Sequence, residues 1–217
     1  MRPGERRKAA RELADAQRAL TYRLAAAVLE YPGEEQRALL PDVRQAAATL
    51  PEEQAAAITG VVDRLLAWDA TEAAAEYVAT FDLKRRHSLY LTYFAYGDTR
   101  KRGVALVEFK TACRTAGFEI VSGELPDHLG VVLELAAQAP EVGIDLMLRH
   151  RAGLELLRLS LLEDGSPWAG ALTAVCATLP ALSGDDREAV ARLAAQGPPE
   201  EEVGLDPFAM PSTGAHR

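Results

Sequence analysis

The chain has 217 residues, of which 48% are hydrophobic and 26% charged, a balance typical of one globular domain with a substantial core. Its 24 basic and 32 acidic residues give a formal net charge of −8, which argues against general affinity for nucleic acid or anionic lipid. The two cysteines, Cys113 and Cys176, have no CxxC neighbour, and no apolar run approaches the roughly 20 residues that span a membrane. We therefore expect a cytoplasmic protein without a disulfide framework and without stable membrane insertion.

Prolines divide the first part of the chain into segments that can be helical, since proline is tolerated in the first turn of a helix. Residues 1–10 are highly charged, and we expect them to be a flexible N-terminus. Apolar stripes then predict four helices, over residues 11–30, 34–49 (with a bend allowed near Pro41), about 51–66 and 72–80.

Residues 88–96 form an aromatic segment, SLYLTYFAY, with few strong helix formers, so propensity alone favours a strand. No other segment offers a partner strand, and we therefore predict a helix that is apolar on nearly all sides and buried at the centre of the domain. A turn at residues 97–99 separates it from a predicted helix over residues 100–116, whose inward stripe includes Leu106 and Phe109.

The second half of the chain continues the helical pattern. Pro126 and Pro140 each stand where a helix can begin, and the apolar stripe after Pro140 continues to Leu161. Two shorter helices are predicted over residues 168–178 and 185–195.

The last part of the chain is rich in proline and glutamate, so we expect residues 197–217 to form a disordered tail. The helices between the two ends predict an all-α fold, a single globular helical-bundle domain over residues 11–196.

The residue types that carry catalysis or bind metals form no known pattern in this sequence. The four histidines and two cysteines lack zinc-ligand spacing, and there is no HExxH, Walker, GxGxxG or GxSxG motif. We therefore expect neither an enzyme nor a bound cofactor or metal, and infer a protein that acts by binding another protein.

Two polar clusters leave alternatives open. The segment ELPDH at residues 124–128 is either a helix start, which elementary physics favours, or a ligand contact made by Asp127 and His128. The basic clusters at residues 84–87 and 100–102 are solvated helix ends, a nucleic-acid surface, or the rim of an aromatic groove that takes up a peptide helix.

Several segments together form a recognisable set: Tyr31-Pro32, YVATFD at 77–82, LYLTY at 89–93, GDTRKRG at 97–103, Phe109-Lys110 and LPDHL at 125–129. This set resembles the NarJ family of nitrate reductase assembly chaperones, which is related to the TorD and DmsD chaperones of other redox enzymes. The similarity covers residues 20–163. The wider family has an E-P-x-D-H motif, which Glu124, Asp127 and His128 match here with the proline shifted to Pro126.

The resemblance implies an all-α chaperone that is not an enzyme. Such a protein binds the N-terminal segment of the apo catalytic subunit of respiratory nitrate reductase in the cytoplasm, until the molybdenum cofactor and an iron–sulfur cluster are inserted. Within the family-like stretch we expect a peptide groove formed by seven residues: Tyr90, Tyr93, Gly97, Leu106, Phe109, Asp127 and His128. The alternatives are a chaperone of a different molybdoenzyme, a helical DNA-binding regulator, or a small hydrolase or transferase with a convergent pocket.

Overall fold

The computed structural model describes residues 2–121 and 123–197, and these are mostly helical. In chain order the α-helices are α1 (Pro3–Leu29), α2 (Glu34–Ala47), α3 (Glu52–Ala67), α4 (Ala70–Tyr77), α5 (Leu91–Tyr96), α6 (Arg100–Thr115), α7 (Leu129–Gln138), α8 (Pro140–Arg149), α9 (Arg151–Glu163), α10 (Ala169–Ala177) and α11 (Gly184–Gln196). A π-helical turn, η1 (Val78–Asp82), and a 3₁₀ turn, η2 (Arg85–His87), connect α4 to α5. The prediction of an all-α domain is confirmed, and the predicted tail lies outside the described residues from 198 onward.

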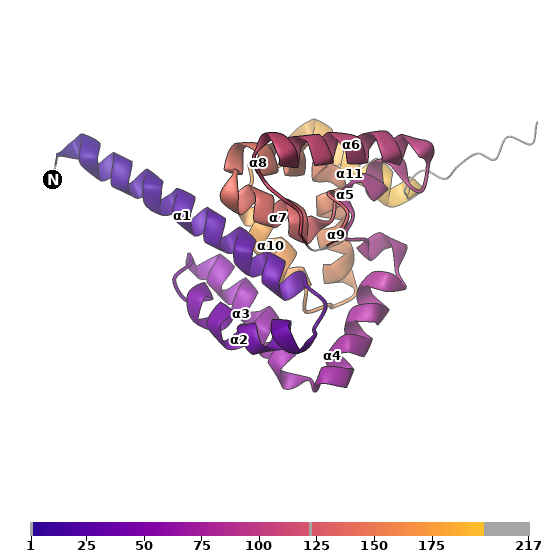
Figure 1. Cartoon of the computed structure of the whole chain (residues 1–217), viewed down its shortest axis with the longest axis horizontal. Helices are drawn as coiled ribbons and strands as arrows, with labels where there is room; N and C mark the ends of the chain where they lie inside the picture. The colour runs from indigo at the N-terminus through magenta and orange to yellow at the C-terminus, as the bar shows by residue number, and fades with distance from the viewer. Residues whose placement is uncertain (1, 122, 198–217) are drawn as a thin grey trace, which may run out of the picture.

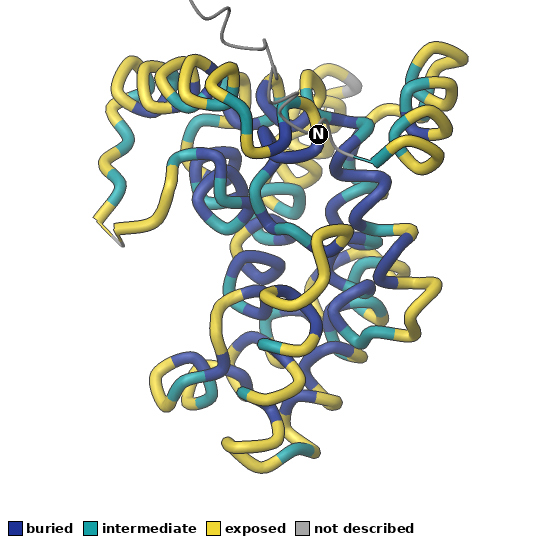
Figure 2. Tube along the Cα trace, turned by 90° about the vertical axis from the view of Figure 1, so that its right-hand side faces the viewer, coloured by how far each residue is buried: buried dark blue, intermediate teal, exposed yellow. Residues whose placement is uncertain are grey.

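Helix α1 organises the packing because its second half is enclosed by other helices. It packs along α7 and also contacts α2, α3 and α10, while its first half projects away from the domain (Figure 1). Residues 4–16 are all exposed. The buried residues of the remaining helices form one core through the middle of the molecule (Figure 2).

The start of α1 differs from the prediction, since the segment expected to be flexible is helical from Pro3 onward. A proline at the first helical position suits a helix start, and the backbone N–H of Arg2 donates to the Glu5 carboxylate at 2.7 Å. These local interactions extend the helix beyond the residues that pack on the core.

The C-terminal end of α1 is fixed by side chains from three other parts of the chain. Carbonyl groups in the last turn of a helix have no partner within the helix. Here Gln36 donates to the Ala27 carbonyl at 3.2 Å, the Trp168 indole to Val28 at 3.0 Å, and the Tyr77 hydroxyl to Leu29 at 3.0 Å. The end of α1 is therefore tied to α2, α4 and the start of α10.

The single helix predicted from Pro140 to Leu161 is wrong, because it is two helices that join at His150. This residue leaves the helical region, with φ −107° and ψ 23°. Helix α8 packs on α7 and α6, whereas α9 packs on α10, α11 and α5, so the chain must change direction between them. The apolar stripe continues through the bend because each of the two helices buries an apolar face.

Helix α7 approaches α8 closely at Gly143. A Cβ atom placed on Gly143 would lie 2.4 Å from the backbone Cα and N of Ala136, a distance that real structures do not tolerate. This contact sets the position of α7, whose first turns form part of the site described below.

Within the described residues, no helix is both long enough and apolar enough to cross a membrane.

The close approach of α7 and α8 predicts a large difference between two glycine substitutions. We expect Gly143→Ala to lower the free energy of unfolding by about 1–3 kcal/mol, because the added methyl group overpacks the contact with Ala136. Gly60→Ala, in an open position of α3, should raise it by about 0.5–1 kcal/mol through the unfolded state. Urea unfolding followed by circular dichroism measures both, and equal effects of the two changes would contradict this packing.

Candidate functional site

Two short segments, residues 89–91 and 127–129, pair with each other although they lie far apart in the sequence. The Leu91 N–H donates to the Asp127 carbonyl at 3.0 Å, and the Leu129 N–H donates to the Leu89 carbonyl at 2.7 Å. Tyr90 and His128 thereby form an isolated antiparallel bridge. Helices α5 and α7 each begin immediately after this bridge.

This pairing corrects two predicted helix boundaries. The helix expected over residues 88–96 is extended at Tyr90 and helical only from Leu91, so both the strand and the helix propensities of that segment are realised in part. The helix expected to begin at Pro126 begins at Leu129 instead, because Pro126 and Asp127 lie in a turn closed by the His128 N–H donating to the Leu125 carbonyl at 3.0 Å.

Asp127 acts as a cap for α5 from another part of the chain. Its carboxylate accepts from the backbone N–H of Thr92 at 3.3 Å and from the Thr92 hydroxyl, and the guanidinium of Arg102 lies 3.7 Å away. A carboxylate at the N-terminus of a helix satisfies unpaired N–H groups and favours the helix dipole. The side chain is completely buried, so the predicted ligand contact of Asp127 is not available in this structure.

Tyr90 lies between two cationic or polarisable groups. The His128 ring meets it edge-on at 5.3 Å between centroids, and the Arg102 guanidinium lies 5.2 Å from the centre of the Tyr90 ring. Burial lowers the pKa of His128, which Glu124 and Asp127 partly oppose, so the ring is neutral at neutral pH. The Tyr90 hydroxyl donates weakly to the Glu124 carboxylate at 3.5 Å.

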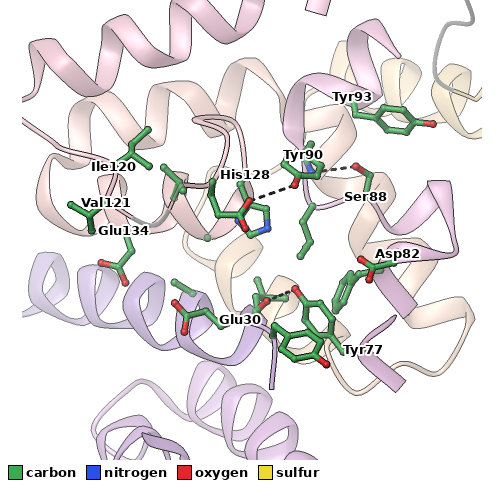
Figure 3. A pocket seen from close by; sticks show the side chains of 18 of the residues that line it. Glu30, Tyr77, Asp82, Ser88, Tyr90, Tyr93, Ile120, Val121, His128 and Glu134 are labelled. Atoms are coloured by element: carbon green, nitrogen blue, oxygen red, sulfur yellow. Dashed lines mark hydrogen bonds between the residues drawn. The ribbon is translucent and has the colours of Figure 1, made fainter. Parts of the chain in front are cut away.

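Beside this bridge lies an open cleft of about 880 Å³, which we term the aromatic–acidic cleft (Figure 3). Its walls are the C-terminal end of α1, the π-helical turn η1, residues 84–93, residues 118–121 and 124, and one side of α7 from Gly130 to Gln138. The aromatic side chains that line it are Tyr31, Tyr77, Phe81, Tyr90, Tyr93 and Phe118. At its edge, Tyr31 is 54% exposed and Val121 88% exposed, which leaves apolar surface available to a ligand.

The charge of the aromatic–acidic cleft is predominantly negative. Among the described residues, only Lys84 and Arg85 supply positive charge to its lining. Six carboxylates supply negative charge: Glu30, Asp82, Asp98, Glu119, Glu124 and Glu134. Burial raises the pKa of Glu30, and the nearby Glu134 and Glu35 raise it further. Burial likewise raises the pKa of Glu134, with Arg23 opposing. A cationic group bound here would relieve the repulsion between these carboxylates.

The structure brings together only part of the predicted set of site residues. Tyr90, Tyr93 and His128 line the aromatic–acidic cleft. Phe109 is 1% exposed and belongs to the core, where its ring packs 5.1 Å from that of His150, so its predicted contact with a peptide is wrong for this structure. Leu106 is half-buried on α6 and does not line the cleft.

Gly97 has a conformational role rather than a contact with the cleft. Its φ of 56° and ψ of −149° belong to a region that L-residues with side chains rarely adopt, and its N–H donates to the Tyr93 carbonyl at 2.7 Å. Gly97 therefore ends α5 and turns the chain into α6.

Several cleft residues were missed by sequence reasoning, namely Glu30, Tyr31, Tyr77, Phe81 and Glu134. The pair Tyr31-Pro32 and the segment containing Tyr77 and Phe81 had stood out only as parts of the family resemblance. The π-helical turn that places Phe81 in the wall has no sequence signature, although such turns frequently mark functional sites. Within the described residues, no group of three or more histidine, cysteine or acidic side chains could hold a metal ion.

The capping role of Asp127 predicts a strong effect on stability. We expect Asp127→Ala to lower the free energy of unfolding by about 3 kcal/mol, because it leaves Thr92 and Arg102 without their buried partner. Asp98→Ala is the matched control, since Asp98 contacts the same Arg102 at 3.5 Å but is 73% exposed, and should cost less than about 1 kcal/mol. Equal losses in urea unfolding would show that Asp127 is not a structural cap.

The raised pKa values of Glu30 and Glu134 predict a stability that depends on pH. Because the folded state favours the protonated form of both groups, their contribution to stability falls as pH rises above the unfolded value of about 4.3. The double variant Glu30→Gln/Glu134→Gln should therefore be more stable than the parent at pH 7, with the difference vanishing near pH 4. Glu188→Gln controls for the loss of an exposed carboxylate, and a pH-independent difference in urea midpoints would refute this expectation.

Comparisons with known proteins agree with the resemblance noted in the sequence. The family model described as nitrate reductase delta subunit matches residues 37–174, more than half of the chain. The chain is 31% identical over 170 residues to the probable nitrate reductase molybdenum cofactor assembly chaperone NarJ of Bacillus subtilis, which covers 75% of this chain and 89% of that protein.

Two further relatives match shorter shares of their own length. The nitrate reductase-like protein NarX of Mycobacterium tuberculosis is 36% identical over 160 residues, 73% of this chain but only 24% of that protein. The nitrate reductase molybdenum cofactor assembly chaperone NarJ of Escherichia coli is 38% identical over 96 residues, 44% of this chain and 41% of that protein. The predicted family is confirmed, and this chain belongs to the nitrate reductase delta subunit family.

Proposed function

We propose that this chain is an assembly chaperone that holds the apo catalytic subunit of a respiratory nitrate reductase while the molybdenum cofactor is inserted. Its family and its relatives named NarJ support this function. The protein acts by binding and catalyses no reaction itself. Loading takes place in the cytoplasm, before the subunit is attached to the membrane, and the cofactor binds the catalytic subunit.

The observation that carries the binding mode is the combination of aromatic walls and carboxylates in one cleft. An amphipathic helix binds in a groove through apolar side chains at intervals of three and four residues. Here Tyr31, Tyr90 and Val121 offer apolar and aromatic contacts. Glu30, at the end of α1, and Glu134, on α7, add negative charge beside them (Figure 3). The cleft therefore suits the N-terminal segment of the catalytic subunit if that segment forms a helix with apolar and basic side chains.

This binding mode revises the groove that the sequence predicted. Tyr90, Tyr93 and His128 remain proposed contacts, whereas Asp127 and Phe109 act indirectly by positioning the segments that carry them. Three other residues replace Leu106 and Gly97 as proposed contacts. They are Glu30 and Tyr31, directly after α1, and Glu134 on α7.

The test measures the affinity of the full chain for the N-terminal peptide of the catalytic subunit by calorimetry. We expect Tyr31→Ala and Glu30→Gln/Glu134→Gln each to weaken binding about tenfold, because an aromatic anchor or a charge complement is lost. Asp145→Asn, an exposed change on α8 outside the cleft, should leave affinity unchanged. Circular dichroism establishes that each variant folds.

Unchanged affinity in both cleft variants would contradict the proposed binding site. Tighter binding to the corresponding peptide of a different molybdoenzyme would keep the cleft but change the client. The family assignment leaves no support for a helical DNA-binding regulator.

A further inference from the structure

The first half of α1 is an exposed basic helix on an acidic protein. Residues 2–11 contain five basic residues and one acidic residue, and residues 4–16 are all exposed. Figure 1 shows this part of the helix extending beyond the rest of the domain. Because residues 4–16 are all exposed, this half of the helix adds little to the core of its own chain.

The projecting helix has two distinct faces. At 100° per residue, Arg6, Ala10 and Leu13 lie on one face, with Arg7 at its edge. Leu13 is 60% exposed there. The opposite face carries two ion pairs, Lys8 with Glu12 at 3.8 Å and Arg11 with Asp15 at 3.9 Å. One face therefore combines positive charge with small and apolar side chains.

That face has the character that the aromatic–acidic cleft would complement. The cleft offers carboxylates, with Glu30 and Glu134 side by side, and exposed aromatic surface at Tyr31. A helix with arginines around Ala10 and Leu13 supplies the opposite charge and an apolar ridge.

The basic face cannot reach the cleft of its own chain. Helix α1 is continuous over 27 residues, and the cleft lies at its C-terminal end. At a rise of about 1.5 Å per residue, Arg7 lies about 35 Å along the helix axis from Glu30. The helix that enters a given cleft must therefore come from another molecule.

We propose that the basic first half of α1 in one copy of this chain docks into the aromatic–acidic cleft of a second copy. Each copy carries one such helix and one such cleft at opposite ends of α1, so an antiparallel arrangement of two α1 helices makes both contacts at once. Such reciprocal contacts close a two-fold dimer. The dimer covers the exposed aromatic surface of the cleft. The last step rests on the proposed function: client peptide and the second copy then compete for the same cleft.

The experiment uses sedimentation velocity of the full chain over a concentration series, with no client present. We expect a monomer–dimer equilibrium whose dissociation constant rises with salt, as exposed ion pairs are screened. Arg6→Glu/Arg7→Glu should weaken the dimer at least about tenfold, which corresponds to about 1.4 kcal/mol. Lys8→Glu, on the opposite face of the same helix, should have little effect.

A charge exchange then separates a direct contact from a structural defect. Glu30→Lys/Glu134→Lys and Arg6→Glu/Arg7→Glu should each be monomeric alone, because each places like charges in both contacts. Mixed one to one, they should form a heterodimer, since both contacts then join opposite charges. Failure of the mixture to associate, or a wild-type chain that stays monomeric at all concentrations, overturns the proposal, as does equal weakening by Lys8→Glu.

The client peptide is added last, to the wild-type chain. If the dimer dissociates as peptide binds, the competition is supported. If peptide binds the dimer without dissociating it, the shared cleft is overturned while the chaperone function stands. If the chain dimerises but binds no client peptide, the proposed function fails and the self-docking stands.

Discussion

The pairing of residues 89–91 with residues 127–129 is the constraint on which the rest of the site depends. Two backbone hydrogen bonds fix the start of α5 and the start of α7 relative to each other, and the Asp127 carboxylate completes the N-terminus of α5. Because α7 also packs along α1, the same pairing sets the distance between the aromatic segment and the end of α1. The cleft is the space that remains between them.

The aromatic–acidic cleft keeps features that folding alone would disfavour. Carboxylates that repel one another, and aromatic rings left in contact with water, both reduce stability relative to a neutral, filled surface. The neighbouring core compensates, since Tyr77 and Phe81, which line the cleft, pack ring against ring with each other and with the buried Trp168. Proteins commonly retain such locally unfavourable groups where a ligand is recognised.

The helices were largely predictable from the sequence because apolar periodicity is a local signal. Tyr90 could not be placed, since its extended conformation depends on hydrogen bonds to a segment 35 or more residues away. Phe109 and Tyr93 look alike in sequence, yet one belongs to the core and the other lines the cleft, and only packing separates them. Glu30 and Glu134 were missed for the same reason, because their proximity arises from the packing of α1 on α7.

The three side chains that cap the end of α1 have a consequence for recognition. Gln36, Tyr77 and Trp168 hold successive carbonyls of that helix, so the wall bearing Glu30 and Tyr31 cannot move without breaking contacts to three other helices. A wall held in this way is preorganised, and the entropy of ordering it is lost during folding rather than on association. In the proposed binding mode, the conformational change on association therefore falls on the incoming segment and not on this wall.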